Sequence, residues 1–514
     1  MTRILRPLAT LLLFAVTAAT FSAPTAPDPA VIARIREEGL QHSQVMDLES
    51  YMADVLGARL TMSDDMQRAQ AWAQKEMATL GLTNVTVEPY MDWGVTWDNE
   101  YVSLQMLEPD YSPMVAYPIA YTSSTNGRQT GEATIVDLQT RADLDRYRGK
   151  LKGMVVLSTP PAVIDMAPLT NGVARWTDDQ LKTIEQTVIT PPRAVTVRAP
   201  RNPDALSATD KLAFYKSEGV LAVLQCESGW LGAVRGYARP GAAADHWSRE
   251  GALASPVILA VTPEHYNRMY RILKRNIPVK VEVEVRNKIG TQVQQAVNIT
   301  GDIAGSDLKD QVVMIGAHFD TWHASPNASD NTSGVAVVLE AARILHTIGA
   351  KPRRTIRVAL WSGEEEGLIG SRAYVLKHFG NPRKPDVGAK PEYATLSAYF
   401  NQDYGAGQYR GIYLQGDEAA RSMMAAWMAP FADFGMTAIS NQSLFQTDHV
   451  SFDEVGLPGF QFLQDHLPAE GGHTNLDFFD TIQGDDLMKN SVMMASFAYD
   501  AAMTDSMVPR KAIR

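Results

Sequence analysis

The fold of this chain is best indicated by one stretch, Thr355-Ile356-Arg357-Val358-Ala359-Leu360 followed by Trp361-Ser362-Gly363-Glu364-Glu365-Glu366-Gly367-Leu368-Ile369-Gly370-Ser371. Its first part is apolar and β-branched, which predicts a buried strand. Three carboxylates then stand in a row at the mouth of that strand. Adjacent like charges repel each other unless a positive group lies between them or water solvates them. The triplet by itself therefore leaves two interpretations open, a metal site and an ordinary solvated acidic loop.

Length and composition narrow the class of protein. A chain of 514 residues exceeds one ordinary core, which predicts two domains or one domain with a large insertion. Hydrophobic residues make up 45% and charged residues 20%, as in folded globular proteins. The formal net charge of -11 argues against nucleic acid as a partner. The single cysteine, Cys226, excludes an intrachain disulfide and a thiolate cluster, so any metal must be held by His, Asp and Glu.

The first 25 residues have the pattern of a signal peptide. Arg3 and Arg6 precede an apolar run over 8–19, and small residues fill 18–26. We expect a secreted or periplasmic protein, with a retained anchor as the alternative. No later segment is apolar over the length of a membrane span, so we expect no stable span once the signal is removed.

From residue 297 onward, strand and helix patterns alternate in the βαβ manner. The predicted strands are 312–315, 355–360, 396–400, 412–414 and 459–463, and the predicted helices are 334–348 and 486–503. Nearer the N-terminus, residues 64–80 have the apolar spacing of a further helix. Ser63 is a suitable N-cap for the first helix. We expect an α/β fold with a mixed, mostly parallel sheet and helices on both faces, formed by residues 26–110 and 290–514. Residues 111–289 read as an inserted β-rich domain, with short strand-like runs between Pro/Gly-rich breaks.

Acidic and imidazole residues recur where the predicted strands end, which is where α/β sheets bind ligands. They are His318, Asp320, Asp330, Glu364, Glu365, Asp403 and His473. Each alone has an ordinary explanation, such as a surface histidine or a helix cap. The two histidines and three of the five carboxylates would be enough for two divalent metals about 3.5–4 Å apart with one bridging carboxylate.

These residues resemble, in identity and in order, the M28 family of co-catalytic zinc peptidases, which includes secreted aminopeptidases and the carboxypeptidase Q group. The resemblance rests on His318-Phe319-Asp320, Ser329-Asp330-Asn331-Thr332-Ser333-Gly334, Gly363 to Ser371, Asn401-Gln402-Asp403 and Gly472-His473-Thr474. It implies the fold of a zinc exopeptidase. The inserted region resembles a protease-associated domain through its strand pattern and position.

The resemblance also implies a role for each residue. His318 and Asp403 would bind one Zn²⁺ and Glu365 and His473 the other, with Asp330 bridging the two. Glu364 would be the general base. Asp320 would accept a hydrogen bond from the second ring nitrogen of His318. A cis peptide is expected at Asp330–Asn331.

Two features depart from the family pattern or leave it ambiguous. Asn331 stands where a second acidic residue is common. The triplet also allows Glu365 and Glu366 to be base and ligand, although the glycine pattern that follows favours Glu364 and Glu365. Asp448 and His449 are expected to line the substrate pocket.

We therefore expect a secreted exopeptidase that hydrolyses short peptides with two Zn²⁺, most simply an aminopeptidase. A carboxypeptidase or dipeptidase of the carboxypeptidase Q type is the alternative, and it would need a cation near the substrate carboxylate, for which Arg235, Arg239 and Arg410 are candidates. Glutaminyl cyclisation, which uses a single zinc on this fold, and a non-catalytic binding protein are the remaining alternatives. The oligomeric state is left open.

Overall fold

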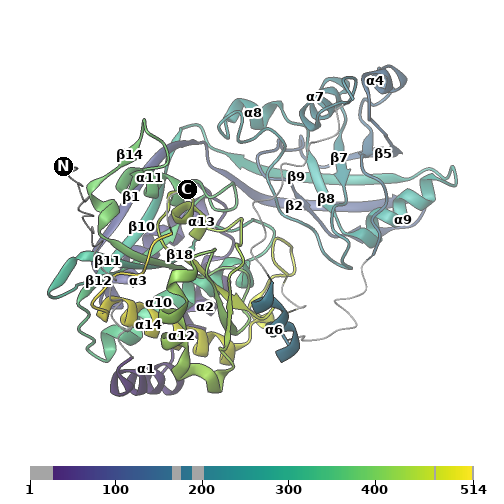
Figure 1. Cartoon of the computed structure of the whole chain (residues 1–514). Coiled ribbons are helices and arrows are strands. Elements are labelled where there is room, and N and C mark those ends of the chain that lie inside the picture. The colour runs from purple at the N-terminus through teal and green to yellow at the C-terminus, as the bar shows by residue number, and fades with distance from the viewer. Residues whose placement is uncertain (1–26, 165–174, 188–201, 468–470, 512–514) are drawn as a thin grey trace, which may run out of the picture.

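The computed structural model describes residues 27–164, 175–187, 202–467 and 471–511. The predicted signal peptide, residues 1–25, lies outside the described residues. Within them, none of the helices combines the length and the apolar composition needed to cross a bilayer. Figure 1 shows two bodies, each built around its own sheet.

The first body contains an eight-stranded sheet in the order β1-β10-β12-β11-β15-β18-β16-β17. The strands are β1 Thr83–Gly94, β10 Gln294–Ile303, β11 Leu308–His318, β12 Arg354–Trp361, β15 Leu396–Asn401, β16 Tyr409–Tyr413, β17 Ala438–Ser440 and β18 Gly459–Gln464. Pairs β12–β11, β11–β15, β15–β18 and β16–β17 are parallel, and the other three pairs are antiparallel. The predicted mixed, mostly parallel sheet is confirmed, and all five predicted strands lie within a few residues of their expected bounds.

Helices cover both faces of this sheet. They are α1 Pro29–Gln41, α2 Val45–Ser50, α3 Asp64–Thr79, α10 Ser333–Thr347, α11 Ile369–His378, α12 Arg421–Met428, α13 His449–Asp453 and α14 Gly484–Met503. Side chains alternate along a strand, so neighbours in β11 face opposite sides. Val313 and Ile315 pack with residues of α10 and α14, whereas Met314 packs with residues of α11 and α13. The prediction of two covered faces is therefore confirmed.

The predicted helices are also present. Helix α3 begins at Asp64, and the Ser63 hydroxyl accepts a hydrogen bond from the Met66 N–H at 3.0 Å, as its N-cap role predicts. Helices α10 and α14 start within two residues of their expected positions. A small two-stranded sheet, β13 Gly380–Asn381 with β14 Gly388–Ala389, follows α11.

The second body is built on the sheet β3-β2-β9-β5-β6-β7-β8-β4. Its strands are β2 Trp97–Glu108, β3 Ser112–Met114, β4 Ala116–Pro118, β5 Gln129–Ile135, β6 Val155–Leu157, β7 Ala222–Gln225, β8 Ile258–Val261 and β9 Lys280–Ile289. Its helices are α4 Arg141–Tyr147, α7 Ala208–Glu218, α8 Arg249–Ala254 and α9 Pro263–Leu273. Neighbouring strands from β5 to β8 pair in parallel.

The domain boundary at residue 110 and the protease-associated identity of the insertion stay predictions. The strand pairing nevertheless places β2, which precedes residue 110, in the second sheet, because β2 pairs along its length with β9. Helix α6, Asp178–Gln186, belongs to the inserted stretch of sequence but packs against β17 of the first sheet.

Buried aromatic residues join the two bodies. Trp93 at the end of β1 stacks on Trp247 of the inserted stretch, with ring centroids 3.9 Å apart. Trp97, Tyr121 and Trp322 complete the same cluster. Large buried aromatic surfaces contribute strongly to stability. This packing holds the second body beside the carboxyl ends of the first sheet's parallel strands.

We expect the α10–α14 layer to carry much of the first body's stability. Leu339 in α10 is 0% exposed, so Leu339→Ala should lower the free energy of unfolding by about 2–5 kcal/mol through lost burial and a cavity. Leu376→Ala in α11, where the side chain is 43% exposed, should cost less than about 1 kcal/mol. Urea denaturation of both variants checks this, and equal losses would contradict the assignment of the core.

Candidate metal centre

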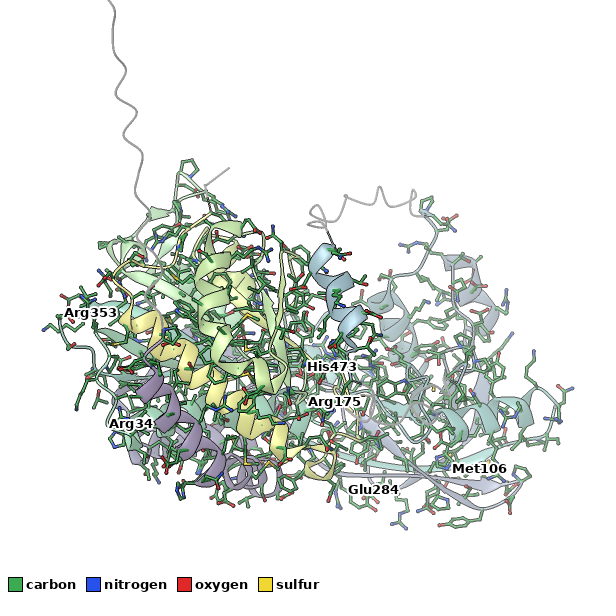
Figure 2. The ribbon with its side chains drawn as sticks, turned by 60° about the horizontal axis from the view of Figure 1, so that its bottom comes forward. Arg34, Met106, Arg175, Glu284, Arg353 and His473 are labelled. Atoms are coloured by element: carbon green, nitrogen blue, oxygen red, sulfur yellow. The ribbon has the colours of Figure 1, made fainter. Side chains whose placement is uncertain are left out.

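The first sheet brings the predicted site residues to one edge. Strands β11, β12 and β15 are parallel neighbours, and each is followed by a candidate residue: His318 ends β11, Glu364 and Glu365 follow β12, and Asp403 follows β15. Asp330 lies in the turn before α10. His473 comes from a loop beyond β18, and Figure 2 shows it where the two bodies meet.

Five of these side chains form two groups that share Asp330. His318 Nε2 lies 3.3 Å from Asp330 Oδ1 and 3.7 Å from Asp403 Oδ1. His473 Nε2 lies 2.9 Å from Asp330 Oδ2 and 3.0 Å from Glu365 Oε2. In each group the possible ligand atoms lie within 4.8 Å of one another. Each oxygen of the Asp330 carboxylate therefore faces a different group.

The donor set and its electrostatics fit bound cations. Imidazole nitrogens and carboxylate oxygens are the zinc ligands available without cysteine. Glu365 Oε1 is buried and has no hydrogen-bond partner among the described residues. Burial lowers the pKa of His473, but Glu365 and Asp330 outweigh this and raise it to about 11. Burial likewise acts to raise the pKa of Asp330, but hydrogen bonds from His318 and His473 hold it well below its usual range. The field of the carboxylates thus favours positive charge at this place.

The turn that carries Asp330 is held from two sides. The Asp477 carboxylate accepts hydrogen bonds from the N–H groups of Ser329 at 2.8 Å and Asp330 at 3.1 Å. The Asn331 amide donates to the Gln402 carbonyl at 2.8 Å. The Asp330–Asn331 peptide is cis, as predicted. Asn331, the departure from the family pattern, thus links the turn to the segment that carries Asp403.

Asp320 accepts the expected hydrogen bond from the second ring nitrogen of His318, but through its backbone carbonyl rather than its carboxylate. The ring nitrogen Nδ1 of His318 donates to the backbone carbonyl of Asp320 at 2.9 Å, whereas the Asp320 carboxylate lies 3.9 Å away. That carboxylate instead accepts from the N–H groups of Glu364 at 3.3 Å and Glu365 at 3.2 Å. The sequence pattern could not distinguish the two, because it does not reveal which oxygen of Asp320 the chain turns towards the ring.

The three glutamates take different positions. Glu364 lines a cavity of about 780 Å³, and Glu365 contacts His473. Glu366 points elsewhere and accepts a hydrogen bond from the Thr61 hydroxyl at 2.9 Å. Burial raises the pKa of Glu364 well above its usual range and that of Glu365 to about 7. This arrangement supports Glu364 as the base and Glu365 as the ligand, rather than Glu365 and Glu366.

The cavity wall differs from expectation at one segment. Asp448 and His449 are both 0% exposed and are not among the residues that line the cavity. Their neighbours Gln446 and Val450 line it instead. A helix begins at His449, so successive residues of this segment point in different directions, which the sequence motif alone does not resolve.

Of the three arginines proposed to bind a substrate carboxylate, one lines the cavity and two do not. Arg235 lines the cavity. Arg239 is buried and pairs with Asp245, and Arg410 Nη1 lies 3.3 Å from Asp465 Oδ1.

Sequence reasoning missed Asp477, and its only signal was its closeness in sequence to His473. It also missed Tyr404, which lines the cavity beside Asp403.

Comparison with known proteins agrees with this geometry. Residues 298–498 match the model of peptidase family M28. Carboxypeptidase Q of Bos taurus is 23% identical over 461 residues, covering 89% of this chain and 85% of that protein. The crystal structure of a peptidase M28 precursor from Shewanella amazonensis has a TM-score of 0.67 at 21% identity, covering 94% of this chain and 99% of that one.

A zinc aminopeptidase from Bacillus subtilis shares the fold, with a TM-score of 0.56 at 18% identity, covering 90% of this chain and 94% of that one. The family match includes the ends of β11, β12 and β15, where the candidate residues gather. Residues 298–498 therefore form a peptidase family M28 domain, and the chain is a metallopeptidase.

Proposed function

We propose that this chain is a secreted dizinc exopeptidase that hydrolyses short peptides. The observation that carries the proposal is the Asp330 carboxylate, with one oxygen 3.3 Å from His318 Nε2 and the other 2.9 Å from His473 Nε2. A carboxylate placed in this way suits a bridge between two metals. Secretion remains a prediction from residues 1–25, which lie outside the described residues.

Zinc fits the donors of each group. His318 and Asp403 would hold one ion, Glu365 and His473 the other, and Asp330 would contact both. When bound, two zinc ions would polarise the scissile carbonyl and lower the pKa of a water towards neutrality. The Asp320 carbonyl orients His318 so that Nε2 faces the cluster, which fixes the ring for binding.

Glu364 is the residue that we propose as the general base. Its side chain lines the cavity next to Glu365, and the Asp320 carboxylate holds the N–H of both residues. Glu364 would accept the proton of the attacking water and then deliver it to the leaving amine. Asp320 therefore acts as a positioning residue for the glutamate segment rather than as a participant in proton transfer.

The second body narrows access to the site. Trp230 and Arg235 from the inserted stretch line the cavity together with the metal-cluster residues. A cavity that the inserted stretch closes on one side suits short peptides better than a folded protein. A substrate terminus can then bind close to the reacting bond, which favours removal of a single residue.

We propose release of the N-terminal residue, an activity suggested by the zinc aminopeptidase from Bacillus subtilis that shares the fold. Carboxypeptidase action is the second candidate. One observation favours it, the presence of Arg235 in the cavity wall, and carboxypeptidase Q is among the relatives.

We expect the purified protein, reconstituted with zinc, to bind about two ions per chain. His318→Ala and His473→Ala should each lower the zinc content, because each removes a ligand of one group. His466→Ala is the matched control, since His466 lines the cavity but belongs to neither group. Metal analysis after gel filtration measures this. A single ion in the unaltered protein would favour the glutaminyl cyclase alternative, and none would favour a binding protein.

Glu364→Gln should lower kcat by about 10²–10⁴-fold, because the amide cannot accept the proton of water. Zinc content should stay unchanged. Glu366→Gln should keep kcat within about 3-fold, because Glu366 contacts Thr61 rather than the cavity. Steady-state kinetics on a dipeptide distinguishes the two. The reverse pattern would move base and ligand to Glu365 and Glu366.

N-acetylation of a dipeptide should lower kcat/KM by at least about 100-fold, because an aminopeptidase binds the free amine of its substrate and the acetyl group removes that amine. The comparison uses free and N-acetylated forms of the same dipeptide and the same zinc-loaded preparation. Equal rates for both forms would exclude an aminopeptidase and support the carboxypeptidase alternative.

A further inference from the structure

We propose that Arg59 is a positioning residue of the metal centre: its guanidinium fixes the segment that follows His318 against the turn that carries Asp330. Arg59 lies in the stretch before α3, upstream of residues 298–498. The inference rests on the proposed function, because it concerns how the proposed zinc ligands are held. It is carried by the hydrogen bonds of Arg59, by its burial and by the charges around it.

The Arg59 guanidinium joins the two segments through side-chain hydrogen bonds. Its Nε donates to the carbonyl of Phe319, the residue after His318, at 2.8 Å. Its Nη2 donates to the hydroxyl of Thr332, two residues after Asp330, at 2.7 Å. A guanidinium is planar and holds its donors in a fixed fork, so the two acceptors keep a constant separation. One side chain thus constrains the distance between the end of β11 and the Asp330 turn.

The backbone of Arg59 is itself fixed to the end of β11. Its N–H donates to the Thr321 hydroxyl at 2.8 Å, and its carbonyl accepts from the Thr321 N–H at 3.1 Å. The remaining donor, Nη1, bonds to the Gly57 carbonyl at 2.9 Å. Arg59 and Thr321 are both buried. The guanidinium therefore extends from a backbone that is already held in place beside the site.

The residue two positions further on contacts the glutamate segment in the same way. The Thr61 hydroxyl accepts from the Gly363 N–H at 3.2 Å and donates to the Glu366 carboxylate at 2.9 Å. These bonds lie on either side of the two glutamates of the site. The stretch 59–61 therefore contacts three of the segments that carry the proposed ligands and base.

Stability alone gives no reason for an arginine at this place. Arg59 is 0% exposed, and so is Glu49 of α2, whose two carboxylate oxygens lack a hydrogen-bond partner among the described residues. Burial lowers the pKa of Arg59 to about 10 and raises that of Glu49 well above its usual range. Apolar residues in place of buried ions are often equally stable or more so. The hydrogen bonds from Arg59 to two ligand-bearing segments do supply a reason.

The test measures the zinc affinity of the metal-free protein by competition with a chromophoric chelator, in the absence of substrate. Arg59→Met keeps the length of the side chain but removes its donors. It should weaken zinc binding by about 10- to 100-fold, as does the loss of other residues that orient metal ligands. The absorption spectrum of the Co²⁺-loaded variant should also differ from that of the unaltered protein, because the spectrum reports ligand geometry.

A double variant keeps the test valid if Arg59→Met alone does not fold. Arg59→Met with Glu49→Gln leaves neither buried charge behind, so the cost of an uncompensated carboxylate is avoided. Its Tm shows whether the protein is folded. The double variant should lose as much zinc affinity as predicted for the single one, since the missing hydrogen bonds are the same.

Arg354→Met is the matched control. Arg354 is 1% exposed, and its guanidinium also donates to backbone carbonyls, those of Ala501 and Thr504. It is the first residue of β12, at the end of the strand opposite the glutamates. Zinc affinity should stay within about 3-fold of that of the unaltered protein, because a change at a distant site acts independently. Equal losses of zinc affinity in Arg354→Met and Arg59→Met would show a general effect on folding and overturn the inference.

Arg59→Lys separates position from charge. Lysine keeps the positive charge near Glu49 but lacks the planar fork, so zinc affinity should stay low. Full affinity in Arg59→Lys, or in folded Arg59→Met, would overturn the inference. A protein that binds two zinc ions, loses affinity in Arg59→Met and hydrolyses no peptide would refute the peptidase proposal but keep the positioning role.

Discussion

The carboxylate of Asp330, held between two imidazoles, is the constraint around which the site is arranged. Its oxygens lie 3.3 Å from His318 and 2.9 Å from His473, so the strand end of β11 and a loop beyond β18 must meet at one carboxyl group. The turn is fixed by Asp477 from the His473 loop and by Asn331 bonded to the Asp403 segment. Buried carboxylates so close together are stable only with compensating positive charge.

The parallel strands explain why this arrangement can form. Neighbours β12, β11 and β15 end at the same edge, and their buried residues pack against helix layers on both faces. The site residues therefore lie on short extensions of a rigid core. The Asp320 carboxylate continues this support by holding the N–H groups of Glu364 and Glu365. Positioning by backbone hydrogen bonds suits a site that must not rearrange when charge moves within it.

The second body contributes to the same cavity from the opposite side. The stacked Trp93 and Trp247 anchor it near the strand ends, and the bridge between Arg235 and Thr474 joins it to the His473 loop. Part of the cavity wall, including Trp230 and Arg235, thus comes from outside the first sheet. Substrate selection can thus depend on residues outside the metal cluster.

The sequence by itself determined the alternation of strands and helices, the chemical identity of the donor residues and their order, because these follow from local periodicity and from residue type. It also favoured Glu364 and Glu365 over the alternative pair. Only the tertiary structure decided which oxygen of Asp320 accepts from His318, that Asp448 and His449 are buried and do not line the cavity, and that Asp477 hydrogen-bonds the Asp330 turn. It likewise separated Arg235 from Arg239 and Arg410. These outcomes depend on side-chain direction and on contacts between distant segments, which local patterns do not encode.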